Sequence, residues 1–358
     1  MLVLEPLEAP MDPVAALERV AHLIDRSLGS SRKAAAFRTA ARALAAAGPD
    51  RVAELHRTQR LTSLSGVGDS TGSVAIEALD GVVPARLAEL EETSVVPLGE
   101  GAALRAALRG DCHAHSTWSD GGATIREMAT AARALGHEYL VMTDHSPRLT
   151  VAHGLNRERL LKQLDEIEAL NQELAPFRIL TGCEVDILLD GSLDGDPDML
   201  DRLDVVVASV HSKLRMPRME MTERMVKAVL DPRVDILGHC TGRKVKGLPP
   251  TGPEALGAAD YVRPPSQFDA DIVFAACEAT DTAVEINCRP ERRDPPDELL
   301  AQAVAMGCRV SIDTDAHAPA QLEWQPYGCD KAVRHGLGPD DVVNTWALDD
   351  LLSWAADH

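Results

Sequence analysis

The feature that most constrains the fold is a series of short apolar runs that alternate with helical patterns between residues 138 and 317. The runs read EYLVMTDHS, FRILTGCEVD, DVVVASVHS, VDILGHC, TAVEINC and CRVSIDTDAH. Continuous apolar strands separated by helices are typical of a parallel sheet covered on both faces, either open or closed into a barrel. The pattern therefore predicts an α/β fold for this part of the chain.

Five of these runs carry histidines or carboxylates at or just after their carboxyl ends. The residues in question are Asp144–His145, Glu184, His211, His239 and the group Asp313, Asp315 and His317. In a parallel α/β barrel all strand ends of one kind lie on one rim, where active sites are built. We therefore expect residues that are far apart in the sequence to converge at that rim.

A further stretch, GDCHAHSTWSDGG at residues 110–122, adds His113, His115 and Asp120 to this group. Side chains alternate along a strand, so the two histidines are expected to point the same way. One histidine at a strand end is more often an ordinary core or surface residue, but nine residues at equivalent positions are hard to explain in that way. The predicted metal ligands are His113, His115, Asp120, His145, Glu184, His211, His239, Asp315 and His317.

This set predicts a multinuclear metal centre. Six imidazoles and three carboxylates are more than one tetrahedral ion needs. Nitrogen and oxygen ligands without a thiolate suit manganese, zinc or iron, so we expect two or three Mn²⁺, Zn²⁺ or Fe²⁺ ions. Without metal, carboxylates and imidazoles gathered in a low-dielectric pocket would repel one another or shift their pKa values.

Such centres generate hydroxide from water and hold the oxygens of a phosphoryl group, so phosphoester hydrolysis is the expected reaction. The sequence has no nucleophile elbow and no Walker loop. The nucleophile is therefore expected to be metal-bound water held by His113, His115, Glu184, His211, His239 and Asp315. Basic residues that could hold phosphate are Arg148, Lys213, Arg243, Lys244 and Arg289, and His153 could contact the substrate or serve as an acid. The alternative for each of these basic residues is a solvated side chain with no role in substrate binding.

Charge and cysteine usage restrict the function classes. The formal net charge is −20 at pH 7, which disfavours a passive nucleic-acid-binding module and otherwise indicates solubility. The seven cysteines are scattered without a CxxC pair, as in a reduced cytosolic protein. No apolar run reaches membrane-spanning length, and the N-terminus is acidic where a signal peptide is basic. We expect a cytoplasmic monomer with no membrane association.

The N-terminal part reads as a separate helical domain. We expect a helical domain at 1–92, a linker at 93–108 and the barrel at 109–358. The glycines of GVG at 66–68 lie between two helical patterns and could bring a helix N-terminus close to a phosphate; a plain turn is the alternative. Residues 1–108 hold 11 Lys and Arg against 14 Asp and Glu, a net charge of −3, so this domain is not basic.

The motifs GDCHAH, TDHS, CEVD, SVHS, GHCTGR, EIN and IDTDAH closely resemble the PHP (polymerase and histidinol phosphatase) domain. More narrowly, HSTWSDG, VAHGL, EVDILLDGSLD, SIDTDAH and YGCDKAVRHG are similar to the C-terminal PHP domain of bacterial family X DNA polymerases. The resemblance covers about residues 109–350, and the N-terminal helices resemble the helix-hairpin-helix domain of those polymerases. It implies a distorted (β/α)7 barrel with three metal ions.

By these motifs, one ion would take His113, His115, Glu184 and Asp315. A second would share Glu184 and add His211 and His239, and a third would take Asp120, His145 and His317. The implied activities are manganese-dependent 3′–5′ exonuclease or DNA 3′-end cleaning, and small-molecule phosphatase in other branches.

Two departures narrow the expected activity. About seventeen linker residues leave no room for a polymerase palm and thumb, and the hairpin lacks the lysine of a lyase, so we expect neither nucleotide transfer nor lyase activity. The leading hypothesis is a phosphoesterase acting on DNA phosphodiester or 3′-phosphate ends, with DNA as the substrate. The alternatives are a small-molecule phosphomonoesterase of the histidinol-phosphatase type, acting on a phosphorylated metabolite, and a non-catalytic DNA-binding or scaffolding protein, which the complete ligand set disfavours.

Overall fold

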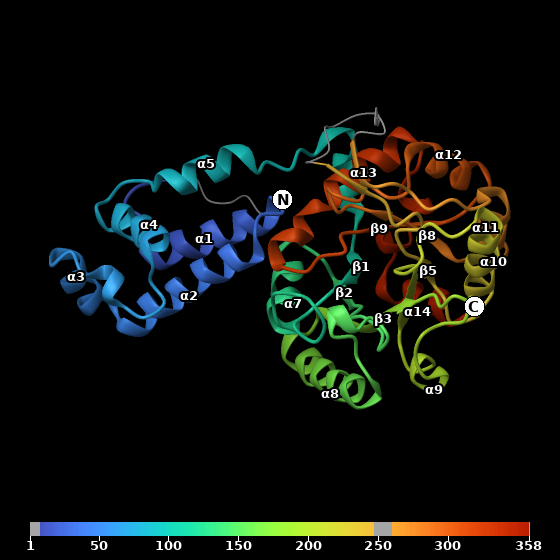
Figure 1. Ribbon diagram of the computed structural model, residues 1–358, viewed down its shortest axis with the longest axis horizontal. Helices are drawn as coiled ribbons and strands as arrows, with labels where there is room; N and C mark the ends of the chain where they lie inside the picture. The colour runs from blue at the N-terminus through green and yellow to red at the C-terminus, as the bar shows by residue number, and fades with distance from the viewer. Residues whose placement is uncertain (1–7, 247–259, 358) are drawn as a thin grey trace. The chain divides into compact units, whose positions relative to one another are not determined.

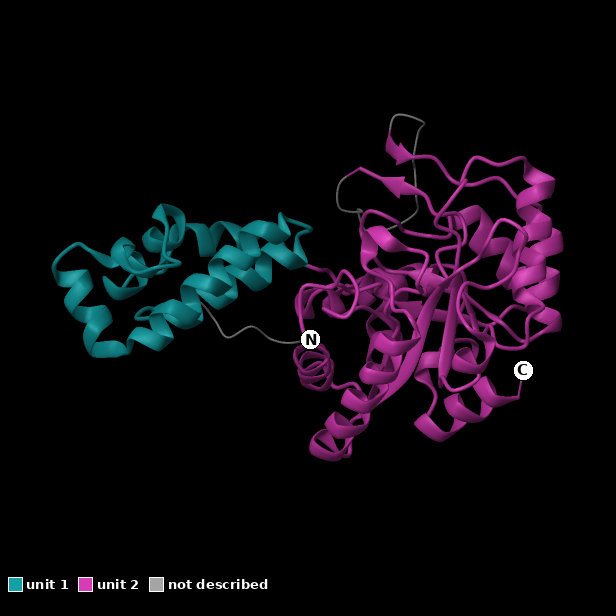
Figure 2. Cartoon of the chain, turned by 60° about the horizontal axis from the view of Figure 1, so that its bottom comes forward, with its two compact units in different colours: residues 1–95 teal, residues 96–358 magenta. Residues whose placement is uncertain are grey.

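The computed structural model describes residues 8–246 and 260–357. The chain divides into two compact units, residues 1–95 and residues 96–358 (Figure 2). Within the described residues, no helix has both the length and the apolar character needed to cross a bilayer.

The first unit is helical, as the sequence predicted. Its helices are α1 (Pro13–Arg26), α2 (Ser31–Ala47), α3 (Pro49–Arg57), η1 (Leu61–Ser63), α4 (Asp69–Leu79) and α5 (Ala85–Thr93). Helix α1 begins where the side chain of Asp12 accepts a hydrogen bond from the Ala15 N–H, a typical N-cap. Apolar residues at helical spacing, including Leu17, Val20 and Ile24, are buried against α2 and α4. The unit therefore has a hydrophobic core of its own.

The second unit is built on seven parallel strands in the order β1 (Gly110–Ala114), β2 (Tyr139–Met142), β3 (Arg178–Asp186), β4 (Val205–Ser209), β5 (Ile236–Leu237), β8 (Ala283–Asn287) and β9 (Val310–Asp313). A parallel bridge between Ala114 and Ala316 brings the chain after β9 beside β1 and nearly closes the barrel (Figure 1). The predicted seven-stranded α/β barrel is confirmed. A separate antiparallel pair is formed by β6 (Lys244–Val245) and β7 (Tyr261–Arg263).

Helices surround the strands (Figure 1). They are α6 (Ala102–Ala107), α7 (Ile125–Ala134), α8 (Arg157–Leu174), α9 (Pro197–Leu200), α10 (Arg218–Val229), α11 (Ala270–Ala279), α12 (Asp297–Ala305), α13 (Gln325–Arg334) and α14 (Leu348–Ala356). Helix α6 and the short η2 (Gly99–Gly101) lie within the stretch predicted as a linker and belong to the second unit. They are held there because Leu104 is buried and the Glu100 N–H donates to the Asp330 carboxylate.

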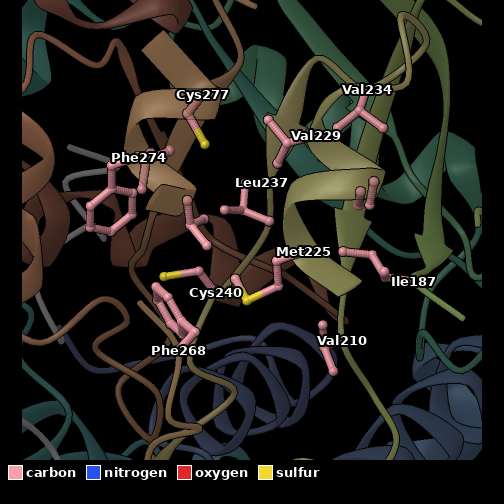
Figure 3. Close-up of a cluster of buried hydrophobic side chains, with 14 of the residues drawn as sticks. Ile187, Val210, Met225, Val229, Val234, Leu237, Cys240, Phe268, Phe274 and Cys277 are labelled. Atoms are coloured by element: carbon pink, nitrogen blue, oxygen red, sulfur yellow. The ribbon is translucent and has the colours of Figure 1, made fainter. Parts of the chain in front are cut away.

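Two apolar clusters stabilise the barrel. One packs Leu237 of β5 against Met225 and Val229 of α10 and Phe274 of α11 (Figure 3). The other joins residues near the amino ends of neighbouring strands with α14: Tyr139, Val141, Leu180, Val205, Val207, Ile236 and Leu351. Polar side chains are thereby left to the carboxyl ends of the strands, where the predicted site residues lie.

Candidate metal centre

The structure brings all nine predicted ligands to the carboxyl ends of the strands. His113 lies in β1 and Glu184 in β3, whereas the remaining seven lie in the segments that follow β1, β2, β4, β5 and β9. These seven are His115, Asp120, His145, His211, His239, Asp315 and His317. The convergence arises because parallel strands place all their carboxyl ends on one rim.

Glu184 is the centre of the group and is 1% exposed. Its Oε1 lies 2.7 Å from Nε2 of His239 and 3.1 Å from Nε2 of His211. Its Oε2 lies 2.9 Å from Nδ1 of His145 and 3.3 Å from Nε2 of His113. One carboxylate therefore faces imidazoles delivered by β1 and by the segments after β2, β4 and β5.

A second, more open group lies around Asp120, whose side chain is 34% exposed. Asp120 Oδ1 lies 3.5 Å from Nε2 of His145 and 3.3 Å from Nε2 of His317. Together with His115, these residues each offer a ligand atom within 4.8 Å of the others. His115 Nε2 also lies 3.4 Å from Oδ1 of Asp315, which links this group to the buried one. We call Asp120, His145 and His317 the outer group.

The donor atoms fit metal ions. Both carboxylate oxygens of Glu184 and buried ring nitrogens of His113, His115, His211 and His239 face one another at ion-pair distances but make no well-formed hydrogen bond within the described residues. Buried polar atoms without a hydrogen bond destabilise the folded protein, and bound divalent ions would remove this penalty. Three overlapping groups satisfy the spacing for a shared ion: His115–Asp120–His145–His317, His113–His115–Glu184 and His145–Glu184–His211. The cluster thus suits several ions, and imidazole with carboxylate is the donor set of zinc, manganese and iron sites.

Two further carboxylates support the histidines and were missed in the sequence. Glu285 of β8 has its Oε1 2.5 Å from Nδ1 of His113, and its Oε2 accepts the backbone N–H of His239. Asp186 accepts the backbone N–H of His211 at 3.1 Å. Carboxylates on the far nitrogen of an imidazole fix its tautomer and orientation. Glu285 is a charged residue inside the apolar run TAVEINC and Asp186 is the last residue of β3, and these are the signals that the sequence offers for them.

The electrostatics follow from this packing. Burial opposes charge on Glu184, but His211 and His113 outweigh it and hold the pKa of that carboxyl well below its usual range. Burial lowers the pKa of His115 to about 3, and the neighbouring His317 and His145 act in the same direction. His115 is therefore neutral near pH 7, which is the form that binds a metal ion.

The predicted phosphate-binding residues fall into two classes. Arg148, His153 and Lys213 are exposed, on the segments after β2 and β4. Arg243 is fully buried, and its guanidinium donates to the backbone carbonyls of Arg292, at 2.9 Å, and Arg293. Its substrate role stays a prediction, and these two hydrogen bonds are to the backbone.

Two arginines lie directly at the centre. Arg289 Nη1 donates to the carbonyl of Asp315 at 2.9 Å and lies 3.1 Å from Nδ1 of His317. Arg292, which was not singled out in the sequence, donates from Nε to Oδ2 of Asp315 at 2.7 Å. Lys244 instead pairs with Glu291 at 2.9 Å. The positive charge nearest to the centre thus comes from Arg289 and Arg292.

Comparisons with known proteins agree with this geometry. The PHP domain family matches residues 111–260. The DNA polymerase/3′-5′ exonuclease PolX of Bacillus subtilis (strain 168) is 40% identical over 244 residues, which are 68% of this chain and 40% of the relative. The chain thus spans about 40% of that relative's length. A probable phosphatase of Thermoanaerobacter sp. (strain X514) is 28% identical over 248 residues, 66% of this chain and 89% of the relative.

Among solved structures, the histidinol phosphate phosphatase of Lactococcus lactis, complexed with zinc, L-histidinol and phosphate, aligns with a TM-score of 0.43 and 18% identity. The alignment covers 64% of this chain and 94% of that one. The family match identifies a PHP domain at residues 111–260 of this chain.

Proposed function

We propose that this protein hydrolyses phosphodiester or 3′-phosphate groups at DNA ends, as a 3′–5′ exonuclease or an end-processing enzyme in DNA repair. At the coarser level it is a metal-dependent hydrolase of phosphate esters. The observation that carries the proposal is the cluster of imidazoles around Glu184, in which several buried ring nitrogens and both carboxylate oxygens have no hydrogen-bond partner within the described residues. Several metal ions, either Mn²⁺, Zn²⁺ or Fe²⁺, would satisfy these atoms.

Each part of the cluster has a role in this proposal. His113, His115, Glu184, His211, His239 and Asp315 would hold the inner ions, and the outer group would hold a further one. Bound ions would supply an activated water and neutralise charge on the phosphate oxygens. Glu285 and Asp186 keep the imidazoles of His113 and His211 oriented.

The arginines and the exposed loops would position the substrate. Arg289 and Arg292 present guanidinium groups beside Asp315, where they can donate to phosphate oxygens. Arg148, His153 and Lys213 project from exposed segments after β2 and β4, so they are placed to contact a longer substrate. We therefore keep these three as proposed substrate contacts.

Two observations support DNA as the substrate. PolX, named as a DNA polymerase and 3′-5′ exonuclease, is 40% identical over the matched region. In the first unit Gly66 has φ 92° and Gly68 precedes α4, so GVG forms a tight turn into a helix N-terminus. Helix N-termini bind phosphates, and this turn is the proposed helix-hairpin-helix contact with DNA.

The alternative is a small-molecule phosphomonoesterase of the histidinol-phosphatase type. The probable phosphatase of Thermoanaerobacter aligns over 89% of its length with 66% of this chain. The formal net charge of −20 also favours a small substrate over a polyanion. The proposal includes a monomer in the cytoplasm, and the seven cysteines, which are buried and form no disulfide within the described residues, support the cytoplasmic location.

The proposal is tested by loading the purified protein with Mn²⁺, Zn²⁺ or Fe²⁺ and offering three substrates in parallel. These are a 3′-labelled single strand, an abasic duplex, and a panel of phosphorylated metabolites that includes histidinol phosphate. We expect shortened or end-trimmed DNA. Phosphate release from metabolites alone would establish the alternative. His211→Ala should abolish the activity, whereas His335→Ala, which changes a histidine paired with Asp297, should not.

A further inference from the structure

Another buried carboxylate, that of Asp144, accepts several hydrogen bonds beside the proposed metal centre. It is 1% exposed. Oδ1 accepts from the backbone N–H groups of Ser116, at 2.8 Å, and Ser119, at 3.1 Å, and from the Ser119 hydroxyl. Oδ2 accepts from the Ser116 hydroxyl at 2.7 Å and from Nε2 of Gln163 at 2.6 Å. Both oxygens are thus engaged by protein donors, so Asp144 is not itself placed to bind an ion.

These bonds hold the loop that carries Asp120. Within this loop, the N–H groups of Ser119 and Gly121 donate to the carbonyl of Ser116, at 3.1 and 2.9 Å. The loop is closely packed, since a Cβ on Gly121 would come within 2.7 Å of the His115 carbonyl. The hydrogen bonds from Ser116 and Ser119 to Asp144 therefore fix the turn that positions Asp120.

The other two residues of the outer group are attached to the same network. His145 directly follows Asp144 in the sequence. The N–H of Gly122, at the end of the loop, donates to the carbonyl of His317 at 2.7 Å. Asp120 thus lies in the loop, His317 is tied to the loop by a hydrogen bond, and His145 adjoins Asp144 in the chain. The inner histidines His113 and His211 are instead supported by Glu285 and Asp186.

We propose that Asp144 and Gln163 are positioning residues for the outer metal position: they hold the loop at residues 116–122 so that Asp120, His145 and His317 form a site. Gln163 lies on α8 and is 1% exposed, so it connects this helix to the loop through Asp144. His113 and His211 have carboxylate contacts of their own, with Glu285 and Asp186, so the inner positions should depend less on Asp144 and Gln163. Because the side chain of Asp120 is 34% exposed whereas that of Glu184 is 1% exposed, we expect the outer ion to be bound more weakly and to exchange first.

Metal counting tests this inference, which rests on the proposed metal centre but not on its substrate. Gln163→Leu and Ser119→Ala each remove a donor to Asp144, and Asp144→Asn replaces one acceptor oxygen with a donor group. Each variant of the full chain is loaded with Mn²⁺ or Zn²⁺, and bound ions are counted by elemental analysis and isothermal titration. We expect the wild type to bind one ion more weakly than the rest, and the affinity for that ion to fall at least tenfold in the variants.

Asn171→Leu is the matched control. Asn171 also lies on α8, where its side chain makes two hydrogen bonds to the backbone of Ile179 and none to Asp144. This variant should keep all its ions even if its melting temperature falls as far as that of Gln163→Leu. The inference is overturned if folded Gln163→Leu and Ser119→Ala bind every ion with wild-type affinity, if they lose all ions together, or if the wild type binds no ion at the outer position. A metal-binding result is independent of whether DNA is cleaved.

Discussion

At the scale of single residues, Glu184 is the group on which the centre depends most. Four imidazole nitrogens lie 2.7 to 3.3 Å from its two oxygens. Its negative charge would allow the Glu184 carboxylate to be a shared ligand of neighbouring ions. Glu184→Gln keeps the volume but removes the charge. We expect at least a ~100-fold loss of metal affinity and a comparable loss of phosphoesterase activity, measured by titration calorimetry and turnover. Glu158→Gln, which changes an exposed glutamate on α8, should leave both unchanged. Full metal occupancy in Glu184→Gln would refute this role.

Glu285 should act through the histidines that it holds. Glu285→Gln weakens the contact with Nδ1 of His113 and the hydrogen bond from the His239 N–H, so both imidazoles lose orientation. Removing such a supporting carboxylate typically costs about 10–100-fold in metal affinity or activity. We expect a loss in that range, smaller than for Glu184→Gln, with an unchanged circular dichroism spectrum. A variant with wild-type affinity would mean that Glu285 only fills the barrel.

At the scale of elements, much of the architecture could be predicted because a parallel barrel requires a repeated sequence pattern of apolar strands and helices. Each parallel strand is an apolar run, and polar residues follow it at the carboxyl end. Glu184, His211 and His239 could therefore be placed at the rim of the barrel from the sequence alone. Contacts between distant segments leave no such pattern. Nothing local shows that Arg243 donates to the carbonyls of Arg292 and Arg293, or that Glu285, inside a strand, contacts His113.

The register of β1 could not be foreseen either. Strict alternation predicted that His113 and His115 share a face, but pairing with β2 shifts between Asp111 and Ala114. Both imidazoles still lie near Glu184, at 3.3 and 3.5 Å. The irregularity is consistent with a bulge, a feature common beside active sites because it re-aims side chains.

His137 links three elements and makes stability depend on pH. Its Nε2 lies 2.9 Å from Oε1 of Gln325 in α13, and Gln325 in turn donates to the Gly110 carbonyl of β1. Burial, helped by the charge of Arg105, lowers the pKa of His137 from 6.5 to about 3. Below pH 6.5 the unfolded chain therefore binds a proton that the folded protein does not bind.

This proton reduces the free energy of unfolding by about 1.4 kcal/mol for each pH unit between 6.5 and the folded pKa. Near neutral pH and above, His137 does not make the free energy of unfolding depend on pH. We expect His137→Gln to remove this part of the slope when urea unfolding is measured at pH 7, 6 and 5 and compared with wild type. His335→Ala, which changes the histidine directly after α13, serves as the comparison. Parallel pH slopes for wild type and His137→Gln would contradict the low pKa.

At the scale of the whole molecule, the two units should respond differently to metal removal. The proposed ligands all belong to residues 96–358, whereas residues 1–95 have their own core. Ions that bind only the folded barrel stabilise it by about 2.7 kcal/mol at a concentration one hundred times the Kd. That corresponds to a rise of roughly 5–10 °C in the melting temperature of a unit of this size.

Calorimetry of the full chain, with and without a chelator, should therefore show one transition that falls with metal removal and one that does not. Hydrogen exchange identifies them: added Mn²⁺ or Zn²⁺ should protect β1, β3 and the segment after β9, and leave α1 and α2 unchanged. The physical reason is that Glu184 and the histidines, which make no well-formed hydrogen bond to any described residue through several of their buried atoms, would gain direct bonds to the ions. If chelation left both transitions unchanged, the cluster would be held by the fold alone, and a metal-dependent activity would have lost its structural basis.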